Sequence, residues 1–170
     1  MEIVELDVAM VDARADELAQ LLLDAHASGM ALGLAAPLTA GRAAAEWRSL
    51  AERADGDGRV LLAAIDDGVV VGAGHLARAD AENGRHRGEI QRLAVRADRR
   101  GAGVGGALLD ALVLRARAAG LSLLWLTTHA DTRSDSFYAA RGWTRTGVVP
   151  GWSQRPDGER VPNAFFYLEL

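Results

Sequence analysis

The chain has 170 residues, 49% of them hydrophobic and 25% charged, and a formal net charge of −4 at pH 7. This acidic balance argues against a general nucleic-acid binder, because such proteins carry a basic surface. The chain contains no cysteine, which excludes a disulfide framework, a thiolate metal site and a catalytic thiol. All 19 lysine-plus-arginine residues are arginine, which also excludes Schiff-base chemistry and a lysine-dependent phosphate loop.

The length predicts a single domain spanning residues 1–170, since a chain of this size buries a sizeable core without disulfides. Its start, MEIVELDVAM, lacks the basic residues and long apolar core of a secretion signal. No stretch approaches the ~18 apolar residues of a membrane-spanning helix. We therefore expect a cytoplasmic protein without a membrane partner.

The first third of the chain predicts one strand followed by two helices. Leu18, Leu21 and Leu22 recur at helical spacing, and Asp12 precedes them at a position suited to capping the helix. The expected elements are a strand at 2–8, a helix at 12–29, a loop at 29–39, a helix at 40–54 and a turn at 55–58.

The remainder of the chain predicts strands separated by turns and by two further helices. Two apolar runs joined by Asp-Asp-Gly predict an antiparallel hairpin. The expected elements are strands at 59–67 and 69–79, a turn at 83–88, a strand at 88–98, a helix ending near 120, a strand at 121–128, a helix at 134–142, a strand at 143–149, a loop at 150–162 and a strand at 163–170. This order indicates an α/β fold in which helices cover a mixed sheet.

Four glycines, Gly101, Gly103, Gly105 and Gly106, crowd the sequence RRGAGVGGALL just before an apolar run. We call residues 101–106 the glycine loop. Its letters satisfy the dinucleotide pattern G-x-G-x-x-G, but the charged stretch RADRR adjoins it and no acidic residue follows about 20 positions later. A P-loop is also excluded, because alanine and leucine stand where lysine and serine or threonine are required.

Glycines at the start of a helix expose its first amide groups, and these groups together with the helix dipole bind anions. Arg96, Arg99 and Arg100 add positive charge beside the glycine loop of an otherwise acidic chain. The alternative is a loosely ordered helix start, but each glycine costs roughly 0.5–1 kcal/mol relative to alanine inside an element. We therefore expect the glycine loop to bind a pyrophosphate.

The strand before the glycine loop changes phase along its length. Ile90 and Leu93 are three positions apart, whereas Leu93 and Val95 are two apart, so the alternation slips around Gln91 and Arg92. A β-bulge, which inserts one residue and bends the strand, produces such a slip. The alternative interpretation is that an arginine stem lies on the apolar face.

The segments GEIQRLAVRADRRGAGVGGALLDAL and LLWLTTHADTRSDSFYAARGWTRTG resemble the coenzyme-A-binding core of the GNAT superfamily of acyl-CoA-dependent N-acyltransferases. Arg100 to Gly105 match the family signature Q/R-x-x-G-x-G/A, between E-I-x-x-L-A-V and F-Y-x-x-x-G-W segments at family spacing. The resemblance places the core at about 58–149 and acceptor-site elements at about 25–45 and 149–162. Segments at both ends of the chain are similar to the tabtoxin-resistance acetyltransferases.

The resemblance implies a mixed, mostly antiparallel twisted sheet of about seven strands with helices on both faces, splayed at the bulged strand 89–96. It also implies acetyl transfer from acetyl-CoA to a primary amine of a small molecule, such as a toxin or antibiotic, by direct attack in a ternary complex. The alternatives are a protein N-terminal acetyltransferase and a non-catalytic acyl-CoA-binding sensor. Similar folds commonly dimerise, so a homodimer is allowed, and no nucleic-acid partner is expected.

Carried over by position, the resemblance assigns roles to individual residues. Backbone groups of Leu93, Ala94 and Val95 would bind the pantetheine arm and supply the oxyanion donor. Tyr138, at the F-Y position, would protonate the leaving thiolate, and Glu89 would take a proton from the attacking amine. The residues whose amide groups would bind the pyrophosphate are Arg100, Gly101, Ala102, Gly103, Val104, Gly105 and Gly106.

Several further polar residues leave the identity of the general base open. Histidine is the residue type suited to act as a base near neutral pH, which makes His75, His86 and His129 candidates, and His129 lies closest in sequence to the expected site. Proton transfer through water is a further alternative. Thr127 stands where the tabtoxin-resistance branch has an acidic residue, and Trp152 is expected to be exposed and to line an acceptor pocket. No carboxylate–histidine cluster has metal-ligand spacing, so no metal is expected.

Overall fold

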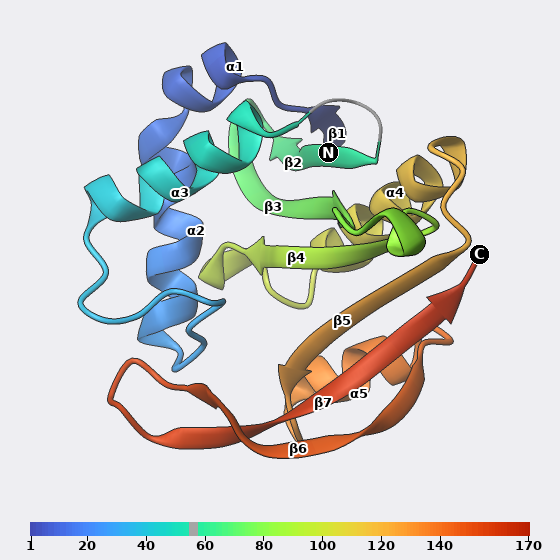
Figure 1. Ribbon diagram of the computed structural model, residues 1–170. Helices are drawn as coiled ribbons and strands as arrows, with labels where there is room; N and C mark the ends of the chain where they lie inside the picture. Colours follow the sequence, from blue (N-terminus) through green and yellow to red (C-terminus); the bar gives the residue numbers. More distant parts are fainter. Residues whose placement is uncertain (55–57) are drawn as a thin grey trace.

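The computed structural model describes residues 1–54 and 58–170, which form helices and strands around one sheet (Figure 1). The helices are α1 (Val8–Ala13), α2 (Ala15–Ala27), α3 (Ala40–Glu52), α4 (Val104–Ala118) and α5 (Arg133–Ala139). The strands are β1 (Glu2–Glu5), β2 (Arg59–Asp66), β3 (Val69–Arg78), β4 (Arg87–Val95), β5 (Leu123–His129), β6 (Thr144–Gln154) and β7 (Arg160–Glu169). None of the described helices is long and apolar enough to span a membrane.

The strands form a seven-stranded sheet in the order β1-β2-β3-β4-β5-β7-β6. Neighbouring strands are antiparallel except β4 and β5, which are parallel. The described pairing of β4 with β5 ends at Glu89 and Trp125, and beyond these residues the two strands run apart toward the left of Figure 1. We call this divergence the split. The predicted mixed, mostly antiparallel sheet, splayed at strand 89–96, is confirmed.

β4 contains the bulge that its phase slip predicts. Ala73 and His75 of β3 lie opposite Ala94 and Gln91, so β4 has one residue more than β3 between the same two pairs. Arg92 lies in this interval and has a left-handed φ of 52°. That conformation costs a non-glycine residue about 1–2 kcal/mol, so other contacts must hold the bulge in place.

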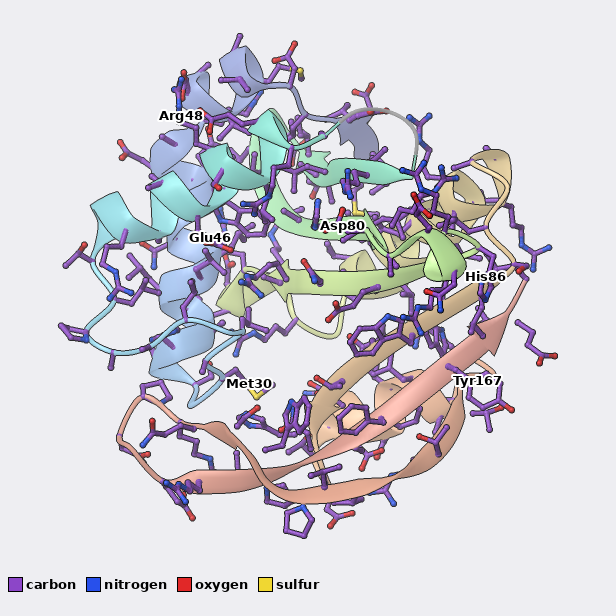
Figure 2. All side chains as sticks on the ribbon, viewed as in Figure 1. Met30, Glu46, Arg48, Asp80, His86 and Tyr167 are labelled. Carbon is purple, nitrogen blue, oxygen red and sulfur yellow. The ribbon has the colours of Figure 1, made fainter. Side chains whose placement is uncertain are left out.

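The side chain of Arg92 ties the bulge to the helical layer. Its Nε and Nη2 donate to Oε1 of Glu46 on α3 at 3.1 and 2.8 Å, and Glu46 projects from α3 toward β4 in Figure 2. Arg92 Nη1 also lies 2.8 Å from the position that a Cβ would take on Gly33. The loop after α2 therefore packs directly on the guanidinium that fixes the bulge.

Apolar side chains form a core on each face of the sheet. On one face, Leu108 and Leu112 of α4 pack with Leu124 of β5. On the other face, Leu22 of α2 and Trp47 of α3 pack with side chains of β2 and β3. Alternate residues of a strand point to opposite faces, so α1, α2 and α3 cover one face and α4 and α5 the other. The prediction of helices on both faces is confirmed.

The first predicted helix is wrong in its start and its continuity, because α1 and α2 are separate helices. Asp7 caps α1, and its Oδ1 accepts a hydrogen bond from the amide of Met10 at 2.8 Å. Asp12, the predicted cap, instead forms an ion pair with Arg48 of α3. The predicted turn at 55–58 falls mostly on residues 55–57, which lie outside the described part of the chain.

The predicted loop at 150–162 is wrong for most of its length. β6 extends through Gln154, so residues 155–159 alone connect it to β7. Pro150 is accommodated because β6 is the edge strand of the sheet and because its pairing with β7 shifts register around that residue. Turn-forming residues are therefore absorbed into a long, irregular edge strand.

Candidate active site

A cavity of about 550 Å³ lies where the split, the glycine loop and α5 meet. Met30, labelled in Figure 2, lines it beyond the C-terminal end of α2. Among the described lining residues, five are arginines and none is an aspartate or glutamate. In a chain of net charge −4, this lining creates a local positive potential suited to a polyanionic ligand. The five arginines of this main cavity are Arg99, Arg100, Arg133, Arg141 and Arg155.

The glycine loop leads into α4 and leaves the start of the helix uncapped. Gly103 has a φ of 87°, which glycine adopts without strain, and no side chain in the described part of the chain caps the helix. The first amides of an α-helix have no intrahelical acceptor, and here they belong to Val104, Gly105 and Gly106. Because Gly103, Gly105 and Gly106 line the main cavity, the positive end of the helix dipole contributes to its potential.

Two arginines complete this anion site, Arg133 at the start of α5 and Arg141 just after its end, and no motif in the sequence predicted either. The guanidinium of Arg141 lies 4.0 Å from the centroid of the Phe137 ring. Its Nη2 stands 2.5 Å from the position that a Cβ would take on Gly106, so the missing side chain lets Arg141 close over the start of α4. Arg133 lies 3.8 Å from the equivalent position on Gly101 and forms no hydrogen bond or ion pair with another described residue.

Arg100 lines the main cavity but uses its nitrogens within the protein. Nη1 donates to Oγ of Ser28 at 2.7 Å, Nη2 to the carbonyl of Asp24 at 3.2 Å, and Nε to the carbonyl of Val95 at 3.3 Å. These bonds fasten the glycine loop to the end of α2 and to the end of β4. Arg100 therefore shapes the cavity and adds charge, while Arg133 keeps its donors available to a ligand. Arg141 uses Nη1 in a long 3.5 Å hydrogen bond to the carbonyl of Phe137 and keeps its other donors available.

Tyr138 lies on α5 between the main cavity and the core. It is 9% exposed, and its ring packs edge-on against Phe137 and Trp143, with centroids 5.0 and 6.0 Å away. Its hydroxyl has no hydrogen-bond partner among the described residues, and the residue lines the cavity. Burial raises the pKa of the Tyr138 hydroxyl well above its ordinary value, so this group holds its proton throughout the neutral range.

Glu89 lies in a second cavity of about 520 Å³, lined also by Trp125, which we call the Glu89 hollow. Its neighbour on β4, Ile90, packs in the core on the α4 face of the sheet. The side chain of Glu89 therefore points to the other face, which α1, α2 and α3 cover. Its Oε2 accepts a hydrogen bond from Nε2 of Gln91 at 2.7 Å. Burial raises the pKa of the Glu89 carboxyl, while the Gln91 hydrogen bond and the charge of Arg92 act in the opposite direction.

The three candidate histidines occupy different environments. His75 is buried and lines neither cavity, and burial lowers its pKa to about 4. His86 is exposed in the connection before β4, at the far end of the sheet from Met30 (Figure 2). His129 lines the main cavity, where burial and then the charge of Arg155 lower its pKa. Within residues 1–54 and 58–170, no three His, Cys, Asp or Glu side chains are grouped to hold a metal ion.

The structure gathers most of the predicted site residues around the main cavity. Ala102 and Val104 do not line it, and Glu89 lies in its own hollow instead. Trp152 is 55% exposed, as predicted, but its ring contacts Phe165 and it lines neither cavity. The predicted residues that line the main cavity are Leu93, Ala94, Val95, Arg100, Gly101, Gly103, Gly105, Gly106 and Tyr138.

The chain is similar to known acetyltransferases in sequence. Residues 17–143 match the acetyltransferase (GNAT) family model. A mycothiol acetyltransferase from Propionibacterium freudenreichii subsp. shermanii is 35% identical over 95 residues. This similarity covers 55% of the chain but 30% of the relative, so the chain aligns with less than a third of that protein.

Solved structures share the same fold over the whole chain. A ribosomal-protein-alanine N-acetyltransferase from Brucella melitensis has a TM-score of 0.82 and 23% identity, covering 100% of both chains. A putative acetyltransferase from Salmonella typhimurium, solved with its cofactor acetyl-CoA, has a TM-score of 0.77 and 19% identity, covering 99% of this chain and 93% of that chain. Acetyl-CoA is the acetyl donor of this family. Because the family model spans most of the sequence, including β4, the glycine loop and α5, the chain belongs to the GNAT family of acetyltransferases.

Proposed function

We propose that this protein transfers the acetyl group of acetyl-CoA to a primary amine of a small molecule by direct attack. One observation carries the proposal. Among the described residues, a single cavity combines five arginines, an uncapped helix N-terminus and the side chain of Tyr138, whose hydroxyl has no hydrogen-bond partner. Transfer of an acetyl group from a thioester that carries phosphates requires an anion-binding region and a proton donor in the same cavity.

The residues of the main cavity fit the donor. Acetyl-CoA supplies the acetyl group as a thioester, on an amide-containing arm that ends in a pyrophosphate. The amides at the start of α4, with Arg133 and Arg141, would hold the pyrophosphate. The described pairing of β4 with β5 ends at Glu89, which leaves the backbone of Leu93 and Val95 beside the split to bind the arm. This explains why a split and a glycine loop occur together.

The proposed chemistry needs one proton acceptor and one proton donor. The amine nitrogen bonds to the acetyl carbon, the carbon–sulfur bond breaks, and the sulfur receives a proton. Tyr138 is the proposed donor of that proton, because it lines the main cavity and its hydroxyl carries a proton throughout the neutral range. Glu89 is the proposed acceptor of the amine proton, because its raised pKa makes it a stronger base than an exposed carboxylate. His129 is the alternative acceptor, since it lines the main cavity.

We assign the acceptor to the Glu89 hollow, whose volume suits a small molecule. No residue of the segments 25–45 and 149–162, where the family resemblance places the acceptor, is among the described residues that line this hollow. Trp125 and Leu123 supply an apolar wall, and Asp80 and Arg87 supply charges of both signs. Neighbours in the fold are named for acceptors as different as ribosomal proteins and aminoglycosides. The resemblance of the end segments to tabtoxin-resistance acetyltransferases favours an amino-acid-like amine, and this remains a prediction.

A panel of amines tests the proposal through release of free CoA from acetyl-CoA. The panel contains amino acids, aminoglycosides, polyamines and short peptides with free N-termini. We expect turnover with at least one small amine, and a loss of that turnover in both Tyr138→Phe and Glu89→Gln. Turnover with peptides alone would instead identify a protein N-terminal acetyltransferase.

Ligand binding separates the remaining alternatives. Acetyl-CoA, but not NAD, is expected to raise the melting temperature. Stabilisation by acetyl-CoA without CoA release from any amine would favour a sensor and contradict the proposed activity. Absence of stabilisation by acetyl-CoA would overturn the assignment of the main cavity to the donor.

A further inference from the structure

Glu89 ends a chain of hydrogen bonds that begins at a buried histidine. Nε2 of Gln91 donates to Oε2 of Glu89 at 2.7 Å, and Oε1 of Gln91 lies 3.3 Å from Nδ1 of His75. His75 is 2% exposed, and its Nε2 is buried without a hydrogen-bond partner among the described residues. Buried polar atoms without partners are uncommon, so the presence of a histidine here calls for an explanation.

The strand register brings these three residues together. His75 of β3 and Gln91 of β4 are direct cross-strand partners. Glu89 is two positions from Gln91 and therefore shares its face of β4. The side chains thus form a row across two paired strands, and the position of each is set by backbone that the sheet holds in place.

The donor and acceptor roles in this row follow from Glu89. An ionised carboxylate only accepts hydrogen bonds, so the amide nitrogen of Gln91 must face Glu89. The amide oxygen of Gln91 then faces His75, whose Nδ1 must carry the hydrogen. Because burial lowers the pKa of His75 to about 4, the imidazole stays neutral, and this tautomer leaves Nε2 as the nitrogen without hydrogen.

We propose that Gln91 and His75 are positioning residues for Glu89: they hold its Oε2 in place and leave Oε1 to receive the proton of the acceptor amine. The inference rests on the proposed role of Glu89 as the base. His75 acts through Gln91, since it fixes which end of the amide faces the carboxylate. A neutral, buried imidazole at this position therefore has a role even though it lines neither cavity.

Charged groups on the strands β2, β3 and β4 and on the connections after α3 and β3 lie near the row. The charge of Arg92, in the bulge of β4, favours the ionised form of Glu89. Burial is the main cause that lowers the pKa of His75, and the hydrogen bond to Gln91 acts in the opposite direction. The charges of Arg53 beyond α3, of Arg92, and of Arg59 on β2 also lower it. The charged groups that line the Glu89 hollow with Glu89 itself are Arg78, Asp80 and Arg87. Gln91 is the hydrogen-bond donor that the structure gives to Glu89.

The test follows the side-chain carboxyl ¹³C resonance of Glu89 as the pH is varied, with the resonance assigned by its loss in Glu89→Gln. Gln91→Leu removes the donor, so the titration midpoint of Glu89 moves to higher pH. His75→Leu removes the support of Gln91 and moves the midpoint in the same direction by a smaller amount. His75→Asn restores the wild-type midpoint, because the asparagine amide nitrogen takes the place of Nδ1.

His86→Leu is the matched control, since His86 is exposed just before β4, and it leaves the midpoint unchanged. Calorimetry with acetyl-CoA shows that each variant is folded. If His75→Leu does not fold, Gln91→Leu still tests the row of hydrogen bonds to Glu89, because Gln91 is only half-buried. Unchanged midpoints in the folded leucine variants would overturn the inference, whether or not Glu89→Gln loses turnover. Shifted midpoints support it, and turnover of Glu89→Gln then decides separately whether Glu89 is the base.

Discussion

Arg141 lies over the ring of Phe137, with its guanidinium carbon 4.0 Å from the ring centroid. This cation–π contact holds the charge over the first turn of α4. We expect Arg141→Gln to weaken acetyl-CoA binding about tenfold, since a hydrogen bond to a charged group contributes ~1.5–3 kcal/mol. Calorimetry measures the loss, and Arg117→Gln, exposed in the last turn of α4, is the control. Equal affinities of Arg141→Gln and the wild type would contradict this role.

Gly106→Ala tests the same arrangement from the backbone. The added Cβ would stand 2.5 Å from Nη2 of Arg141, so the flexible end of the arginine must move away. Position 106 is helical, where alanine is favourable, and we expect the variant to fold but to be stabilised less by acetyl-CoA. Gly105→Ala places its Cβ at an ordinary 3.5 Å from Val95 and should lose less. Thermal denaturation with and without acetyl-CoA compares the two, and equal stabilisation would count against the arrangement.

Tyr138→Phe removes the proposed proton donor and keeps the ring that packs against Phe137 and Trp143. We expect kcat to fall by about 100-fold or more, which is the usual scale of a general acid. The KM for acetyl-CoA and the melting temperature should change little, because the core contacts remain. Steady-state kinetics and calorimetry make the comparison. A variant with the wild-type kcat would exclude Tyr138 from the chemistry.

The environment of His75 makes folding sensitive to acid. Its folded-state pKa of about 4 lies below its ordinary value of 6.5, so the unfolded chain binds this proton more readily. The contribution of neutral His75 to the free energy of unfolding is complete above pH 6.5. It is lost as the pH falls toward 4, and the loss is about 3 kcal/mol at most. We expect His75→Asn to flatten the pH dependence of the free energy of unfolding in this window. Urea denaturation at several pH values measures it, with His86→Asn retaining the wild-type slope.

The features that the sequence predicted well are those that depend on neighbouring residues. A one-residue slip in the alternation of β4 identified the bulge at Arg92, because a paired strand absorbs an extra residue in this way. The glycine loop was predictable for the same reason, since glycines determine both the backbone conformation and the start of α4. Structure that is determined by neighbouring residues in this way can be predicted without knowing the tertiary contacts.

The features that the sequence missed depend on contacts between distant segments. Arg141 reaches Gly106 because α5 packs beside the start of α4, and no local pattern encodes that contact. Pro150 indicated a loop, because only the sheet order shows that β6 is an edge strand that tolerates it. The hydrogen bond from His75 to Gln91 needs the register of β3 against β4, which the separate strand patterns do not specify.

The order of the strands has a consequence for how the molecule could be divided. β1 to β4 lie on one side of the split and β5 to β7 on the other, so the chain crosses it once, through the glycine loop and α4. Each wall of the main cavity is therefore a continuous piece of sequence, and a cut at Gly120, in the exposed turn after α4, separates the two. We expect such fragments to reassociate when acetyl-CoA is added, because the bound donor would contact both fragments and so stabilise their complex.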